Sequence, residues 1–111
     1  MLVFGTDSSP VGVYTVSNCT FNGVGTQGIY INEGRSGAVY NIENCSFTGD
    51  FGASDGAVTI QNNHGVDFTV NVTGCTFNMT NGSHEISYHY NDSAFTLNTD
   101  VDPSKIYCKE N

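Results

Sequence analysis

The chain contains no tryptophan, only two prolines and few charged side chains, because Asp, Glu, Lys and Arg make up 13% of its 111 residues. Lys and Arg number 3 against 11 Asp and Glu, so the formal net charge is −8. Binding to nucleic-acid phosphates or to an anionic membrane surface relies on clustered Lys and Arg. Their scarcity argues against a nucleic-acid partner and leaves cationic proteins, calcium and neutral glycans as candidates.

Long apolar runs are also missing from the sequence. None approaches the roughly 20 residues that a membrane-spanning helix requires, so we expect no insertion into a membrane. The first residues, Met1 to Phe4, lead directly into Gly5 and Thr6 without the pattern of a signal peptide. Two interpretations stay open: a complete cytoplasmic protein, or part of a longer chain that is secreted or displayed at a cell surface.

What the sequence does contain is one short phrase in three copies. Each copy is a turn residue, a cysteine, a hydroxyl residue and a phenylalanine. The copies lie at residues 18–21 (Asn-Cys-Thr-Phe), 44–47 (Asn-Cys-Ser-Phe) and 74–77 (Gly-Cys-Thr-Phe). Cysteine and phenylalanine stand two positions apart, so both face the same side of a strand. Recurrence after 26 and then 30 residues predicts a solenoid of stacked repeats.

Each repeat predicts three short strands and a sharp corner. In the second repeat, residues 28–32 and 38–43 alternate between apolar and polar side chains, and residues 45–48 form a third short segment. Asn44 fits the corner before this third segment because Asn tolerates left-handed backbone angles, and Gly74 suits the next corner. We therefore predict a single all-β domain, a parallel β-helix with three short strands per coil. The competing prediction is a small β-sandwich.

The predicted coils span approximately residues 1–27, 28–55, 56–84 and 85–103. Residues 95–100 match residues 68–73, which puts Asp102 and Pro103 where the repeat has Cys and Thr, and proline cannot donate to a strand ladder. We expect residues 104–111 to form a tail that folds across the C-terminal end, with Cys108 outside the register. The N-terminal coil is expected to be open, so that two copies form a homodimer through it or a longer chain adds coils there.

Stacking the repeats places equivalent residues in inward columns. The predicted apolar columns are Leu2/Ile29/Val58/Ile86, Tyr14/Tyr40/Val70/Leu97, Val16/Ile42/Val72/Thr99 and Phe21/Phe47/Phe77. Cys19, Cys45 and Cys75 form one further column, predicted to consist of buried free thiols that act as small hydrophobic groups. A disulfide within this column is disfavoured, because stacked parallel side chains point the same way and fit the required dihedral angle poorly.

These repeats resemble the right-handed β-helices of the pectin-lyase-like group. The shared elements are the Asn-Cys-Ser/Thr-Phe phrase, preceded by Val or Ile, and the Gly-rich return to Gly-Ala-Val. The repeats are similar, more narrowly, to those of polymorphic outer-membrane proteins and related bacterial surface adhesins, of which residues 55–58 and 77–80 are imperfect copies. The resemblance extends to Asp100. It implies a right-handed, bacterial or phage-type solenoid, in a fold that hosts lyases, hydrolases, adhesins and phage fibres alike.

The outer face of the first strand of each coil is the candidate site, because enzymes of the resembled fold class have a long groove there. This face is expected to expose two columns, Val3/Tyr30/Thr59/Ser87 and Gly5/Asn32/Gln61/His89. Aromatic, amide, hydroxyl and imidazole groups suit sugar hydroxyls, which need ring stacking and polar contacts. The predicted ligand-binding residues are Tyr30, Asn32, Thr59, Gln61, Ser87 and His89. The other interpretation is an ordinary solvated sheet face.

Patterns for catalysis or metal binding are weak. The only arginine is Arg35, the first-strand exterior carries no Asp, and the histidines lack a metal-ligand spacing. We therefore expect no catalytic residue, no metal and no cofactor. The leading interpretation is a non-enzymatic binding or adhesion module for a glycan or a protein. Two alternatives stay open: a small acidic inhibitor, phage-like in size, that presents carboxylates to a basic protein surface, and a fragment of a polysaccharide lyase or hydrolase.

Overall fold

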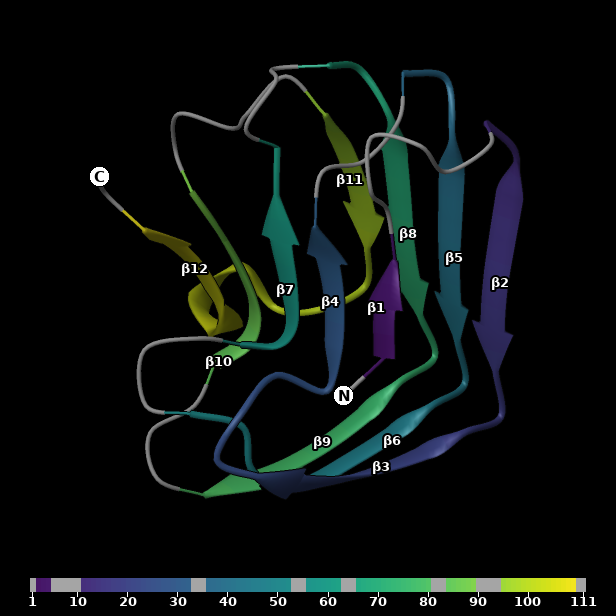
Figure 1. The fold of residues 1–111 in the computed structure, drawn as a ribbon. Helices are drawn as coiled ribbons and strands as arrows, with labels where there is room; N and C mark the ends of the chain where they lie inside the picture. Colours follow the sequence, from purple (N-terminus) through teal and green to yellow (C-terminus); the bar gives the residue numbers. More distant parts are fainter. Residues whose placement is uncertain are drawn as a thin grey trace.

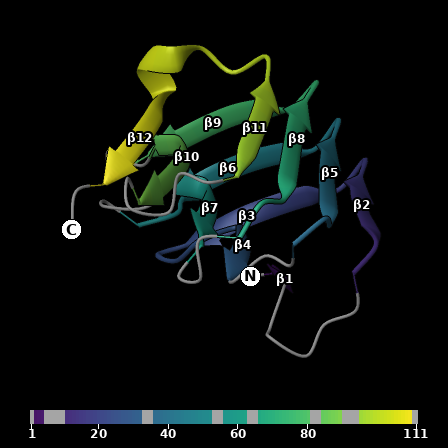
Figure 2. The same cartoon turned by 90° about the horizontal axis from the view of Figure 1, so that it is seen from above.

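The computed structural model describes residues 2–4, 11–32, 36–52, 56–62, 66–80, 84–89 and 95–109. Over these ranges the chain is all-β, and three parallel sheets surround one core (Figures 1 and 2). The predicted parallel β-helix is confirmed. The competing β-sandwich is wrong, because the strands of such a sandwich pair antiparallel whereas these pair parallel. Within the described ranges, no helix has the length and apolar character needed to cross a membrane.

Each of the first three coils contributes one strand to each sheet, in the order sheet A, sheet B, sheet C. Sheet A is ordered β1 (Leu2–Phe4), β4 (Ile29–Asn32), β7 (Gly56–Gln61), β10 (His84–His89) and β12 (Ile106–Lys109). Sheet B is ordered β2 (Val13–Ser17), β5 (Val39–Glu43), β8 (Thr69–Thr73) and β11 (Thr96–Thr99). Sheet C contains β3 (Thr20–Val24), β6 (Ser46–Asp50) and β9 (Thr76–Thr80). The strands of one sheet therefore come from successive coils, and every sheet runs along the solenoid axis.

Strand pairing stacks equivalent residues in the predicted columns. Ile29 lies opposite Val58, and Val58 lies opposite Ile86. In sheet C, Phe47 is in register with Phe21 on one side and with Phe77 on the other. The ring centroids of both pairs are 5.0 Å apart, with interplanar angles of 8° and 7°. In-register stacking of this kind follows from parallel pairing, which brings the same position of each coil side by side.

The three corners between sheets B and C share a left-handed backbone, as predicted. The φ angle is 57° at Asn18, 54° at Asn44 and 65° at Gly74. Asn and Gly adopt such angles at little steric cost. At Gly74, an added Cβ would collide with the side-chain oxygen of Asn44. The third corner is therefore a glycine because the side chain of the preceding corner already fills that space.

The core lies mainly in the second and third coils. Its fully buried members are Ile29, Ile31, Ile42, Phe47, Val58, Ile60, Val70 and Val72, joined from the fourth coil by Ile86. A side chain in a middle coil has a neighbour from the coil before it and another from the coil after it. Side chains of the first coil lack one of these neighbours, and Phe21 and Tyr14 are accordingly only half-buried.

The predicted thiol column shows the same dependence on position. All cysteines are free, as predicted, but the expected burial of the whole column is wrong. Cys45 is buried, Cys75 is half-buried and Cys19 is exposed. The Cys45 thiol donates to the carbonyl oxygens of Glu43, at 3.4 Å, and Val16, at 3.6 Å. Among the described residues, Cys19 has a neighbouring coil on one side only, since β2 pairs with β5 and β3 pairs with β6.

The expected C-terminal tail is a further correction. Residues 106–109 form β12, which extends sheet A beside β10 in parallel register. Cys108 lies opposite Tyr88, so it continues an inward column and is not outside the register. Between β11 and β12 the chain forms the 3-10 helix η2 (Pro103–Lys105), whose N-cap Asp102 accepts a hydrogen bond from the Ser104 amide. As predicted, the repeat pattern ends at Asp102, because proline and this cap replace the third strand of the fourth coil.

Candidate functional site

The predicted site residues on sheet A occupy the expected register. Val3, Tyr30, Thr59 and Ser87 pair in succession, and the column continues to Tyr107 in β12. Asn32 lies opposite Gln61 in the neighbouring column. The backbone of His89 pairs with Lys109, but the side chain of His89 and all of Gly5 lie outside the described parts of the structure.

The prediction that Thr59 and Ser87 form an exposed binding face is wrong, because the two side chains are 2% and 0% exposed. Their hydroxyl oxygens lie 3.2 Å apart within hydrogen-bonding distance. The backbone N–H of Gly56 donates to Ser87 Oγ at 2.9 Å, and Thr59 Oγ1 donates to the Gly56 carbonyl at 3.1 Å. A Cβ at Gly56 would lie 2.7 Å from the Ser87 nitrogen, so glycine permits this close approach. The two hydroxyls therefore bond to the buried backbone of Gly56, the first residue of β7, and do not face solvent.

Tyr30, Asn32 and Gln61, also predicted as site residues, are half-buried. The Tyr30 hydroxyl donates to Gln61 Oε1, which ties an aromatic of the second coil to an amide of the third. At the other end of the sheet, the rings of Tyr107 and His84 stack with centroids 4.5 Å apart. The buried pair Thr59 and Ser87 lies between these two places in the register, so sheet A offers two separate polar–aromatic positions where one continuous face was expected.

A continuous polar array lies instead on the outer face of sheet B, where no site was predicted from the sequence. Asn98 Nδ2 donates to Asn71 Oδ1 at 2.9 Å, and Asn71 Nδ2 donates to Asn41 Oδ1 at 2.8 Å. Asn41 Nδ2 in turn lies 3.4 Å from Thr15 Oγ1, to which it donates. These four side chains, which we call the amide ladder, come from β11, β8, β5 and β2. The four strands lie side by side in sheet B (Figure 1).

The amide ladder has free hydrogen-bonding capacity. Each amide nitrogen carries two N–H groups and each amide oxygen two lone pairs, of which the ladder uses one each at Asn71. Asn41 and Asn71 are half-buried, and Thr15 and Asn98 are exposed, so the remaining groups face solvent. Thr69 and Thr96 flank the ladder on one side, and Ser17, Glu43 and Thr73 flank it on the other. A signal for the ladder was present in the sequence, since residues 41, 71 and 98 hold one residue type at one register position.

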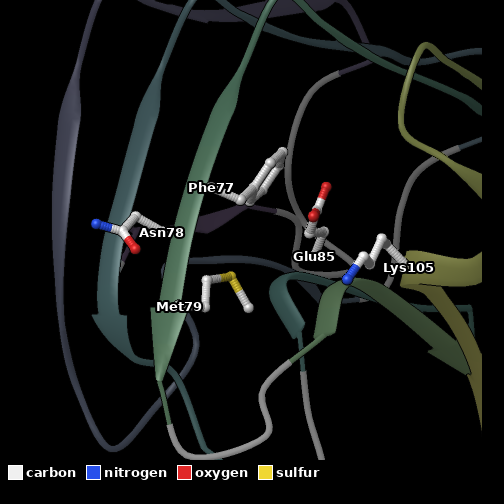
Figure 3. A pocket seen from close by; sticks show the side chains of 5 residues that line it. All are labelled: Phe77, Asn78, Met79, Glu85 and Lys105. Carbon is white, nitrogen blue, oxygen red and sulfur yellow. The ribbon is translucent and has the colours of Figure 1, made fainter.

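Sheet C ends in a pocket of about 280 Å³ beside β9. Phe77, Asn78 and Met79 of β9 line it, together with Glu85 of β10 and Lys105 of η2 (Figure 3). Burial raises the pKa of Glu85 above its ordinary value, and the nearby Lys105 charge opposes that shift. The residues that the structure describes contain no group of three or more His, Cys, Asp or Glu side chains arranged to hold a metal ion.

No protein-family model, curated protein or solved structure matches this chain. The structure itself shows a solenoid of parallel sheets, which is the broader part of the resemblance to β-helical proteins. The narrower likeness to the pectin-lyase-like group rests on the repeat residues alone.

Proposed function

We propose that this chain is a non-enzymatic binding module that recognises a neutral glycan through the outer face of sheet B. The observation that carries the proposal is the amide ladder formed by Thr15, Asn41, Asn71 and Asn98. Sugar hydroxyls both donate and accept hydrogen bonds, and each ladder amide offers a donor and an acceptor in the same plane. The likeness of the repeats to pectin-lyase-like β-helices and bacterial adhesins supports the same ligand class.

The geometry of the ladder favours an extended ligand over a single sugar ring. Strands of a sheet lie about 4.8 Å apart, so three spacings from Thr15 to Asn98 span about 14 Å. The ladder amides hold one another in place, which lowers the entropy lost when a ligand orders them. An oligosaccharide lying along the solenoid axis would therefore meet a row of pre-oriented polar groups.

The charge of this face favours a neutral ligand and a binding role. The ladder consists of hydroxyl and amide side chains, and its flanking columns add further hydroxyls, the apolar Val13 and Val39, and Glu43 as a carboxylate. An acidic sugar would be repelled by this carboxylate and by the net charge of −8. Amide and hydroxyl side chains do not ionise near neutral pH, whereas general acid–base catalysis needs a group that does.

An array of neutral oligosaccharides, probed with the purified chain, tests the proposal. Asn71→Ala removes the central rung and should weaken binding about tenfold, because a ligand hydrogen bond and the alignment of two neighbouring amides are lost. The matched control is Asn78→Ala, which removes an exposed asparagine from sheet C and should leave binding unchanged. Thermal unfolding of both variants verifies that they fold.

Two outcomes would overturn the proposal. One is an array on which the wild-type chain binds no neutral oligosaccharide, and the other is equal binding by Asn71→Ala and wild type. Tyr30→Ala belongs in the same assay, because Tyr30 represents the predicted sheet A face. A loss of binding in Tyr30→Ala with no loss in Asn71→Ala would return the site to sheet A.

A further inference from the structure

Sheet C stops one strand earlier than sheet B and two strands earlier than sheet A. The fourth coil supplies β10 to sheet A and β11 to sheet B, but sheet C ends at β9. One edge of β9 pairs with β6, and β9 is the last strand of the sheet order. The residues that would have formed the next strand form η2, which packs against β10. Among the residues that the structure describes, no strand pairs with the other edge of β9, so a further parallel strand could pair there.

The aromatic column ends at the same place. Phe47 is fully buried between Phe21 and Phe77, whereas Phe77 is only half-buried. Continuing the repeat from Phe77 by 27 residues leads to Ser104, which has no ring to stack on it. The outer face of Phe77 is therefore open where each earlier coil has added another phenylalanine.

The pocket beside β9 occupies this vacant position. Figure 3 shows the Phe77 ring and the Met79 side chain on the inner side of β9, with Glu85 and Lys105 across the pocket and Asn78 pointing away. Its floor is apolar, and its far wall carries one acidic and one basic group. Its volume of about 280 Å³ gives room for a large side chain from an added strand.

We propose that an extended peptide segment of another protein adds to the edge of β9 and completes sheet C of the fourth coil. Backbone pairing to a sheet edge selects an extended peptide, and pockets for alternate side chains select its sequence. The register of β3, β6 and β9 indicates the pattern: a Ser or Thr, a Phe, an Asn or Thr, and then a Gly or Met. The Phe stacks on Phe77, and a Met two positions later lies on Met79.

A folded second copy of this chain does not fit the vacant position. For parallel pairing that continues sheet C, the edge strand of a second copy would be β3, which is held within a coil that also contains β2. Bringing β3 onto β9 would place the sheet A and sheet B strands of that copy at the level already filled by β10 and β11. The partner is therefore a single strand, and the net charge of −8 favours one that is neutral or basic.

A labelled synthetic peptide tests this inference with the full chain. The probe carries the β9 sequence Thr-Phe-Asn-Met-Thr between flanking lysines, and fluorescence anisotropy measures its affinity. Replacing its Phe by Ala, or N-methylating the amides that face β9, should weaken binding at least about tenfold. A scrambled peptide of the same composition controls for charge. Equal affinity of the scrambled and native-order peptides would overturn the inference.

Variants of the chain and hydrogen exchange locate the bound peptide. Met79→Ala should weaken binding, while Asn22→Ala should not, because Asn22 is an exposed asparagine of β3, at the opposite edge of sheet C from β9. Backbone amides of Thr76–Thr80 should exchange at least about tenfold more slowly with peptide bound. Slower amide exchange confined to β3, or no slowing at all, would overturn the inference. Because exchange is measured on the unchanged chain, this outcome counts even if a variant fails to fold. Self-association that the peptide blocks would identify a second copy as the occupant and would equally overturn it.

Discussion

The middle coils and the end coils of this solenoid contain the same residue types in the same register, but they bury them to different degrees. Phe47 is completely buried while Phe21 and Phe77 are half-buried, and Cys45 is buried while Cys19 is exposed. The large exposed apolar residues also lie towards the ends, as Val13 of the first coil shows at 69% exposure. In a solenoid, burial follows from the number of neighbouring coils, so position along the axis matters as much as residue type.

The two ends differ from each other as well. The first coil exposes Leu2, Val3, Val11 and Val13. At the other end, η2 and β12 follow the last complete coil and cover part of it (Figure 2). The exposed apolar residues thus lie on the coil through which two copies were predicted to pair. That pairing stays a prediction.

We expect the largest difference in stability loss between middle-coil and end-coil variants in the phenylalanine column. Phe47→Ala should lower the free energy of unfolding by roughly 3–5 kcal/mol, because a fully buried ring leaves a cavity between two others. Phe21→Ala should cost roughly half as much, since Phe21 is half-buried and has a ring on one side. Denaturant unfolding of both variants measures the difference. Equal losses would mean that a neighbouring coil on each side does not determine the energetics of the column.

A smaller effect is expected where two coils approach most closely. A Cβ at Gly23 would lie 2.6 Å from the carbonyl carbon of Asp50, which is backbone and cannot rotate away. Gly23→Ala should therefore destabilise the protein by about 1–3 kcal/mol. Gly12→Ala is the matched control, because a Cβ at Gly12 has no atom within 4 Å. Thermal unfolding distinguishes the two variants, and equal midpoints would contradict the close packing of β3 on β6.

The middle and end coils can also be compared without changing stability, by measuring the reactivity of the native thiols. Cys45 should react most slowly with a thiol reagent, Cys19 fast and Cys75 at an intermediate rate, in the order of their burial. Burial also raises the pKa of the Cys75 thiol, so less of the reactive thiolate exists at a given pH. Raising the pH should therefore accelerate labelling of Cys75. Mass spectrometry of timed samples reads the order, and fast labelling of Cys45 in the folded chain would contradict the assignment.

Much of the fold could be predicted from the sequence, because a solenoid repeats the same local structure in successive coils. The phrase at residues 18–21, 44–47 and 74–77 marks the same corner three times, and Asn18, Asn44 and Gly74 all adopt the expected left-handed backbone. Inward columns followed because strand alternation and parallel stacking are local rules. Residues 106–109 were misassigned to a tail since this segment pairs with β10 without repeating the phrase.

The candidate site was harder to predict than the fold. Register correctly aligned Tyr30, Thr59 and Ser87, but alternation alone implied that all three face solvent. Thr59 and Ser87 are buried because Gly56 turns back onto their hydroxyls, a contact that strand periodicity does not contain. The amide ladder corresponds to an outward column of asparagine in the repeats. It was not predicted, because the candidate site was assigned to the first strand of each coil by analogy with enzymes of the resembled fold class.

The sequence by itself determined that this protein is a parallel β-helix with defined corners and columns, because each of these features depends on residues close together or on one repeated spacing. Only the tertiary structure decided which outward residues remain exposed, how far each coil is covered and where sheet C ends. Those features depend on contacts between segments far apart in the chain, such as Gly56 with Ser87 and β12 with β10. The amide ladder and the open edge of β9 both arise at this level, where neighbouring coils bring separate side chains and backbone edges together.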